Sequence, residues 1–171
     1  SPDGQSIAYM GVKRGCSTPE CYSVYLRRAD GTGPVRKLAD TAALPIFTPD
    51  GTHIIYTGVP RGFTSWDLVQ VAVAGDPAPV TLITGHPQVA DGRVSPHGRF
   101  LAYSSNESGH WEVYLTLYPG CTGRWQVSTN GGNWPRWNGA GDRLCFAQDD
   151  DVMEVEVGGA EAPVLGTPRK L

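Results

Sequence analysis

The chain has 171 residues, of which 40% are hydrophobic and 9% aromatic, so it can bury a core of its own. Its formal net charge is −3, charged residues make up only 18%, and no basic stripe interleaves with aromatic residues, so we expect no nucleic-acid partner. The 22 glycines and 14 prolines favour turns over long helices, and no apolar run approaches the roughly 18 residues of a membrane span, so we expect no membrane insertion.

A four-residue phrase returns along the chain. It stands at residues 1–4 (Ser-Pro-Asp-Gly), 48–51 (Thr-Pro-Asp-Gly), 95–98 (Ser-Pro-His-Gly) and, in a divergent form, 138–141 (Asn-Gly-Ala-Gly). Its glycines are 47, 47 and 43 residues apart, a period that indicates a repeat architecture. Proline presets φ, aspartate bonds to its own backbone, and glycine accepts a positive φ. Each copy is therefore predicted to be a tight turn between two strands.

Four short strands are expected in each repeat. Those after the turns are residues 7–9, 54–56, 101–103 and 144–146; those before the turns are 44–47, 91–94 and 134–137; the third strands are 22–26, 66–71, 111–115 and 152–157; and the fourth are 35–38, 80–83, 125–128 and 169–171. Four strands in about 40–45 residues are the signature of a β-propeller blade. The sequence predicts an all-β chain, a β-propeller of four-stranded antiparallel blades with about four blades present.

The repeats predict one partial propeller domain. Blade 1 covers residues 1–40 and lacks its innermost strand; blades 2, 3 and 4 cover residues 41–88, 89–132 and 133–171. Propellers typically close with 4–8 blades. We therefore expect the chain either to be part of a six- to eight-bladed ring or to complete a ring by self-association.

The Pro-Asp-Gly turn followed by an apolar-Ala-Tyr strand resembles the TolB-like, WD40-like family of propeller repeats. Residues 95–157 further resemble the propeller segment of bacterial eukaryotic-like Ser/Thr protein kinases. The residues that carry this second resemblance are 104–109 (Ser-Ser-Asn-Glu-Ser-Gly), 112–114 (Glu-Val-Tyr), 118–120 (Tyr-Pro-Gly), 125–128 (Trp-Gln-Val-Ser) and 135–137 (Pro-Arg-Trp). The first resemblance implies protein–protein contacts in the bacterial envelope, and the second implies a sensor domain.

Polar residues on the expected innermost strands are the candidate binding site. In repeat register Asp91 and Trp134 are equivalent, as are Arg93 and Arg136, and packing does not explain Asp91 and the two arginines. We hypothesise that these four line the mouth of a central channel and contact a protein or peptide partner. The alternative, held equally, is that Asp91 and the arginines neutralise each other or face water.

The four cysteines fall into two groups. Cys16 and Cys21 lie in one exposed hairpin, where they form either a disulfide, which would suit an oxidising, extracytoplasmic location, or two ordinary thiols. A metal site is less expected there because no histidine lies nearby. Cys121 sits in a glycine-rich tip without an implied partner. Cys145 aligns with Ala102 and is predicted to be buried and inert.

No catalytic motif is found. The chain lacks a Gly-x-Ser-x-Gly elbow and a His-Glu-x-x-His helix, and its histidines (His53, His86, His97 and His110) have no nucleophile at a suggestive spacing. Residues 149–151 (Asp-Asp-Asp) suit a solvated turn better than calcium. We therefore expect a non-catalytic binding or sensing module with no cofactor and no metal. The alternative is the gating propeller of a dipeptidyl-peptidase-type serine peptidase; a propeller lyase or glycosidase is a weaker third.

Overall fold

The computed structural model describes residues 1–59, 65–75, 78–84 and 88–171. The chain divides into two compact units, Ser1–Ala90 and Asp91–Leu171. Within the described residues the regular structure is almost entirely β, the exception being one turn of 3₁₀ helix, η1 (Pro19–Cys21). In that part of the chain, no helix is long and apolar enough to cross a membrane.

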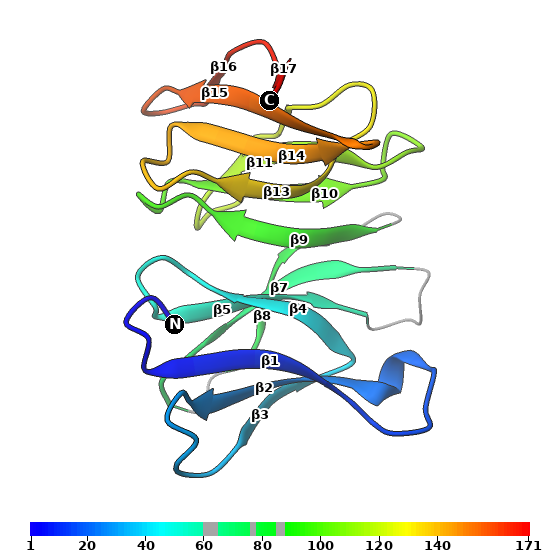
Figure 1. Cartoon of the computed structure of the whole chain (residues 1–171), viewed down its shortest axis with the longest axis vertical. Coiled ribbons are helices and arrows are strands. Elements are labelled where there is room, and N and C mark those ends of the chain that lie inside the picture. The colour runs from blue at the N-terminus through cyan, green and yellow to red at the C-terminus, as the bar shows by residue number, and fades with distance from the viewer. Residues whose placement is uncertain (60–64, 76–77, 85–87) are drawn as a thin grey trace. The chain divides into compact units, whose positions relative to one another are not determined.

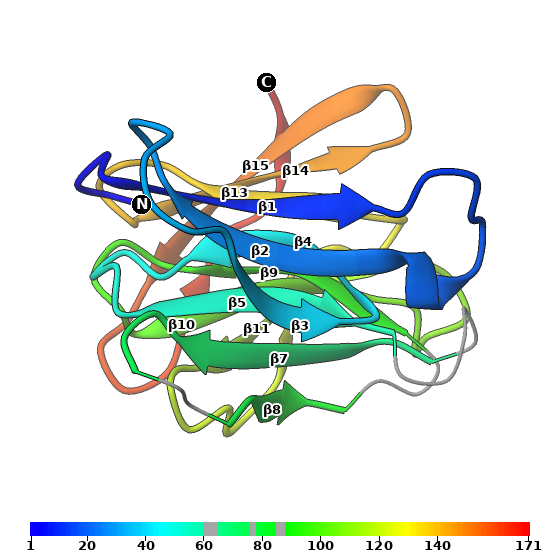
Figure 2. The ribbon, with the colours of Figure 1, turned by 90° about the horizontal axis from the view of Figure 1, so that it is seen from below.

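The described residues of unit 1 form two antiparallel sheets. The first has the order β1-β2-β3, and the second has the order β4-β5-β7-β8 (Figure 1). Figure 2 shows β5, β7 and β8 side by side. The strands are β1 (Ser6–Val12), β2 (Tyr22–Arg28), β3 (Arg36–Asp40), β4 (Ala42–Phe47), β5 (His53–Gly58), β7 (Asp67–Ala72) and β8 (Val80–Ile83).

The other two sheets belong to unit 2, apart from the first two residues of β9. Their orders are β9-β10-β11-β12 and β13-β14-β15-β16, and β17 also pairs with β15. The strands are β9 (Val89–Val94), β10 (Phe100–Ser105), β11 (Glu112–Leu117), β12 (Trp125–Gln126), β13 (Asn133–Trp137), β14 (Arg143–Gln148), β15 (Asp151–Gly158), β16 (Val164–Leu165) and β17 (Arg169–Lys170).

The four repeated phrases form the turns predicted for them. In each copy the amide of the final glycine donates to the carbonyl of the first residue, at N···O distances between 2.8 and 3.1 Å. All four glycines have φ between 70° and 74°, a region that other residues adopt only at a cost. Asp50 accepts a bond from the amide of Thr52 at 3.0 Å, as the Pro-Asp-Gly chemistry requires. The turn prediction is therefore confirmed.

Each unit has an apolar core to which both of its sheets contribute. The core of unit 1 consists of Val24, Leu26, Ala42, Ile54, Tyr56 and Val71. The core of unit 2 consists of Phe100, Ala102, Val113, Leu115, Val127, Leu144, Phe146, Val155 and Val157. Burying a side chain of this size stabilises the folded state by roughly 1.5–3 kcal/mol relative to leaving it exposed. The strands that carry the candidate site, β9 and β13, pair with β10 and β14, which contribute to the core of unit 2.

The all-β architecture is confirmed, but the sheets do not all have four strands. Among the described residues, the first sheet has no counterpart of β4, β9 or β13, as expected for an incomplete first blade. The fourth sheet gains a strand, because the eight-residue β15 pairs with two short strands at separate places. Val157 lies opposite Leu165 of β16, and Met153 lies opposite Lys170 of β17. Only the second of these was expected from the sequence.

The prediction that Cys145 is buried is wrong. Cys145 is a free thiol of intermediate exposure. On β14 the buried Leu144 and Phe146 enter the core, so Cys145 faces the opposite side of the sheet. There its register neighbours are Arg136 and Glu154, which are polar. Partial burial still raises the pKa of the Cys145 thiol, which disfavours its reactive thiolate form.

Candidate binding site

The strands before the turns share a backbone irregularity at one repeat position. Leu44, Asp91 and Trp134 have φ of 53°, 57° and 55°. On β13 the pairing with β14 shifts register between Asn133 and Arg136, and β4 shifts in the same way between Ala43 and Ile46. A residue other than glycine in this conformation costs about 1–2 kcal/mol. Such strain marks positions where the fold holds a side chain in a particular direction.

Asp91 is the buried centre of a charge cluster in unit 2. It is 3% exposed. Its Oδ1 lies 2.6 Å from Nη2 of Arg93, and its Oδ2 lies 2.8 Å from Nη1 of Arg136. The second contact joins β9 to β13, which belong to different sheets. Because a buried carboxylate needs partners of opposite charge, the two arginines explain how Asp91 is tolerated there.

The two arginines differ in their access to solvent. The side chain of Arg93 is 15% exposed, and that of Arg136 is 52% exposed. Arg93 Nη1 donates to the carbonyl of Gly92 at 2.9 Å. Burial lowers the pKa of Arg93, while Asp91 opposes that change by stabilising the charged form. Arg93 therefore neutralises Asp91 inside the protein, whereas Arg136 is the member of the cluster that solvent or a partner can reach.

Two tryptophans on β13 have different surroundings. The indole of Trp137 donates to the carbonyl of Arg93 at 2.9 Å and lies against Phe100, with 6.5 Å between the ring centroids. Trp134 is 64% exposed, and its backbone amide donates to Ser104 Oγ at 3.3 Å. Trp137 is therefore a packing residue. The backbone of Trp134 is instead fixed by its bond to Ser104, while the large apolar side chain remains exposed to solvent.

The structure brings three of the four predicted site residues into direct contact. Arg93 and Arg136 each form an ion pair with Asp91, and Trp134 lies two residues before Arg136 on the same strand. Asp91 itself is buried, so it positions Arg136 and does not reach solvent. The shared left-handed backbone could not be predicted from the sequence, because glycine, its usual signal, is absent from these positions. The channel mouth stays a prediction.

A second buried carboxylate was also missed. Glu112 is fully buried on β11. Its Oε2 accepts from Ser128 Oγ, and its Oε1 accepts from the amide of Gly131 at 3.0 Å and from Nε2 of His110 at 2.7 Å. A serine triad needs histidine between the nucleophile and the carboxylate. Here the carboxylate stands in the middle, so the cluster ties residues 128–131 to β11 and offers no activated nucleophile.

A polar groove of about 520 Å³ lies elsewhere in unit 2, lined by Glu107, Ser108, Tyr114, Arg124 and Gln126. Nη1 of Arg124 lies 2.8 Å from Glu107 Oε2, and its guanidinium carbon lies 5.9 Å from the ring centroid of Tyr114. The charges of this groove therefore satisfy each other. Within residues 1–59, 65–75, 78–84 and 88–171, no group of three or more His, Cys, Asp or Glu is placed to hold a metal ion.

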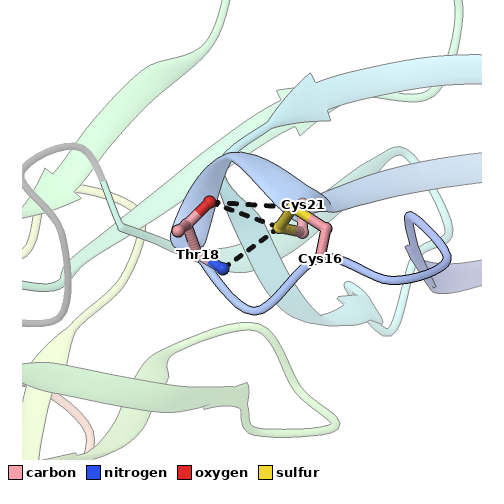
Figure 3. Close-up of a disulfide and its surroundings, with 3 residues drawn as sticks. All are labelled: Cys16, Thr18 and Cys21. Atoms are coloured by element: carbon pink, nitrogen blue, oxygen red, sulfur yellow. Dashed lines mark hydrogen bonds between the residues drawn. A yellow bond between two sulfur atoms is a disulfide. The ribbon is translucent and has the colours of Figure 1, made fainter.

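Cys16 and Cys21 are joined by a disulfide in the hairpin between β1 and β2 (Figure 3). Their Cα atoms are 5.7 Å apart. The amide of Thr18 lies 3.1 Å from Sγ of Cys21, which sits at the end of η1. The amide of Lys13 donates to the carbonyl of Cys21 at 2.9 Å, so the loop is closed by both covalent and hydrogen bonds.

The histidines for which the sequence suggested no chemistry have local partners. Nε2 of His97 donates to the carbonyl of Gly141 at 3.1 Å, linking two of the repeated turns, and its Nδ1 lies 3.1 Å from Ser95 Oγ. Nδ1 of His53 lies 2.8 Å from Thr52 Oγ1. His86 lies outside the described residues.

No protein-family model and no curated protein sequence matches the chain. Solved structures do. A TolB protein from Agrobacterium tumefaciens matches 99% of the chain with a TM-score of 0.76 at 19% identity, and TolB from Acinetobacter baumannii matches 98% with a TM-score of 0.78 at 15% identity. The fold is that of a TolB-like β-propeller.

The TolB-like fold is shared with proteins of other kinds. The β-propeller domain of the Trilobed protease from Pyrococcus furiosus matches 98% of the chain with a TM-score of 0.63 at 9% identity, and the chain covers 54% of it. The chain spans 62% of the Agrobacterium protein and 41% of the Acinetobacter protein. At these identities the likeness establishes the fold, and function must be argued from the site.

Proposed function

We propose that the chain is a non-catalytic binding module that contacts a protein or peptide partner through Trp134 and Arg136. The observation that carries the proposal is the exposure of these two side chains on a strand that strained backbone and a buried Asp91 hold in place. Tryptophan and arginine are the residue types that most often dominate binding energy at protein interfaces. Asp91 already orients Arg136, so this side chain loses little conformational entropy when a partner binds.

We also propose a cellular location for the module and a role in a larger protein. The Cys16–Cys21 disulfide favours an oxidising compartment, so we place the protein outside the cytoplasm, in the periplasm or cell envelope. The resemblance of residues 95–157 to kinase-linked propellers favours a sensor role in a larger protein. The TolB-like fold favours an envelope protein that works through protein contacts. In either role, we propose that Trp134 and Arg136 form the binding surface.

A random peptide library displayed on phage tests the binding role directly. Peptides selected on the full chain are expected to lose binding to the variant Trp134→Ala and to keep binding to Val164→Ala, which removes an exposed apolar side chain from β16 in the same unit. Selection of no peptide, or of peptides that bind Trp134→Ala as well as they bind the unaltered chain, would overturn the proposal.

A second candidate is the gating propeller of a serine peptidase, supported by the likeness to the propeller domain of the Trilobed protease. The two candidates differ in what the complete gene encodes. A Gly-x-Ser-x-Gly elbow in a domain downstream of the propeller would favour the peptidase. A kinase domain upstream would favour the sensor. Sequencing the gene on both sides of this segment distinguishes them.

A further inference from the structure

The cluster around Asp91 carries one net positive charge. One carboxylate faces two guanidinium groups, and both of its oxygens are engaged by them. Arg93 is buried, so the excess charge is offered to solvent by Arg136. The chain as a whole has a net charge of −3, so the excess is local and is not part of a basic surface. Such a site suits one small anionic group better than a polyanion.

One edge of the Arg136 guanidinium group carries donors without an acceptor among the described residues. Its Nη1 donates to Asp91 Oδ2 and to the carbonyl of Pro135, both at 2.8 Å. Neither Nε nor Nη2 has an acceptor within the part of the chain that the structure describes. These two donors share one edge of a planar group, and their spacing matches the two oxygens of a carboxylate.

Trp134 is a second exposed side chain on the same strand as Arg136. Its side chain stands in solvent two residues before Arg136, and its backbone is in the left-handed region. Among the described residues, no acceptor is found for its indole N–H. The ring can therefore cover the apolar part of a ligand while Arg136 holds an acidic group.

We propose that this site binds a carboxylate group of a peptide, either an acidic side chain or the carboxylate at a chain end. The inference rests on the binding role proposed above and names the chemistry that the partner must carry. A phosphate group, with a charge near −2 at neutral pH, would leave its third oxygen and its second charge without a partner at a single guanidinium edge.

The test uses the full chain labelled with ¹⁵N and follows the side-chain N–H signals of Arg136 and Trp134. The probes are the capped tripeptide Gly-Asp-Gly, its neutral counterpart Gly-Asn-Gly, N-acetylated triglycine with a free carboxylate, and inorganic phosphate, all at constant ionic strength. Both carboxylate probes are tried because they distinguish the two peptide sources. We expect a saturable shift of both signals with at least one of them and none with Gly-Asn-Gly.

Variants establish that the shift reports the proposed contact. Arg136→Gln is expected to weaken carboxylate binding on the order of tenfold or more, the size of a lost charge-assisted pair of hydrogen bonds. Arg136→Lys, which keeps the charge near Asp91 if Arg136→Gln does not fold, is expected to weaken it as well, because an ammonium lacks the two-donor edge. Arg28→Gln is the matched control, since Arg28 is exposed and bonded to Asp30 in the other unit.

Three outcomes would overturn the inference: equal shifts with Gly-Asn-Gly, tighter binding of phosphate than of carboxylate, or the same loss in Arg28→Gln as in Arg136→Gln. The result is also separable from the binding role. Selected peptides that need Trp134 but carry no essential carboxylate would leave the binding role standing and refute this inference. Carboxylate binding without any selected peptide would leave this inference standing and refute the binding role.

Discussion

At the scale of single residues, burial decides which member of the charge cluster supports the fold. Asp91→Ala is expected to destabilise the protein by about 3 kcal/mol, because it leaves the buried Arg93 without its carboxylate. Arg136→Ala is expected to cost about 1 kcal/mol or less, because half of its side chain is already in water. Urea unfolding followed by tryptophan fluorescence measures both.

The double variant Asp91→Ala/Arg93→Leu is the control for this comparison. Removing both charges should recover part of the stability lost in Asp91→Ala, since no unpaired buried charge remains. Equal losses for Asp91→Ala and Arg136→Ala would show that burial does not separate the two roles as described.

The strand positions of the candidate site residues could be predicted from the sequence by aligning the repeats. The register placed Asp91, Arg93, Trp134 and Arg136 on innermost strands, but it could not show that Asp91 is buried. Burial and pairing depend on the contact between Asp91 of β9 and Arg136 of β13, which are 45 residues apart in the chain. The role of Glu112 escaped prediction for the same reason, since its partners include Ser128 and Gly131.

At the scale of elements, the Cys16–Cys21 disulfide closes the loop between β1 and β2. Without reductant, thiol titration of the denatured protein should find two free cysteines, Cys121 and Cys145, and with reductant all four. Because the closed loop is short, reduction is expected to lower stability by only about 2 kcal/mol. Four free thiols in protein isolated under oxidising conditions would contradict the pairing.

A second element-scale prediction concerns the edge formed by β14, β15 and β17. Arg169 and Arg143 hold the pKa of the Glu154 carboxyl below its ordinary value. A lowered folded-state pKa means that the stabilisation is present above the ordinary pKa of glutamate and is lost as the pH falls through the lowered value. The melting temperature of the protein should therefore exceed that of Glu154→Gln at neutral pH, and the difference should shrink on acidification.

Glu161→Gln is the control for the pH series, because Glu161 is exposed and has no partner within the described residues. Its melting temperature should equal that of the unaltered protein at every pH. A difference between Glu154→Gln and the unaltered protein that stays constant from neutral to acidic pH would show that the ion pairs do not contribute through the ionisation of Glu154.

Most strands could be predicted because turn-forming residues recur at the same position of each repeat. The Pro-Asp-Gly turns determine where a strand ends and the next begins, so the elements around residues 48–51 and 95–98 agree closely with the structure. The fourth sheet departs from prediction near its end, where β16 and β17 share β15. No turn phrase stands there, and two-residue strands lack a periodic pattern to recognise.

At the scale of the whole molecule, the sequence leaves two predictions for how the blades are completed. Light scattering over a range of concentrations, with a thermal melt on the same sample, separates them. A discrete dimer with a sharp melt is the result expected if two chains complete one ring. A polydisperse or weakly cooperative monomer is the result expected if the blades belong to a longer propeller.

We propose that a partner binds at the surface formed by the exposed side chains of Trp134 and Arg136. Hydrogen–deuterium exchange of the full chain, with and without a peptide selected from the displayed library, tests it most directly. Protection is expected in β13 and in residues 91–94 of β9, which the Asp91–Arg136 ion pair links to β13. Protection confined to the groove of Glu107 and Arg124, or to the hairpin of Cys16 and Cys21, with no change in β9 and β13, would contradict it.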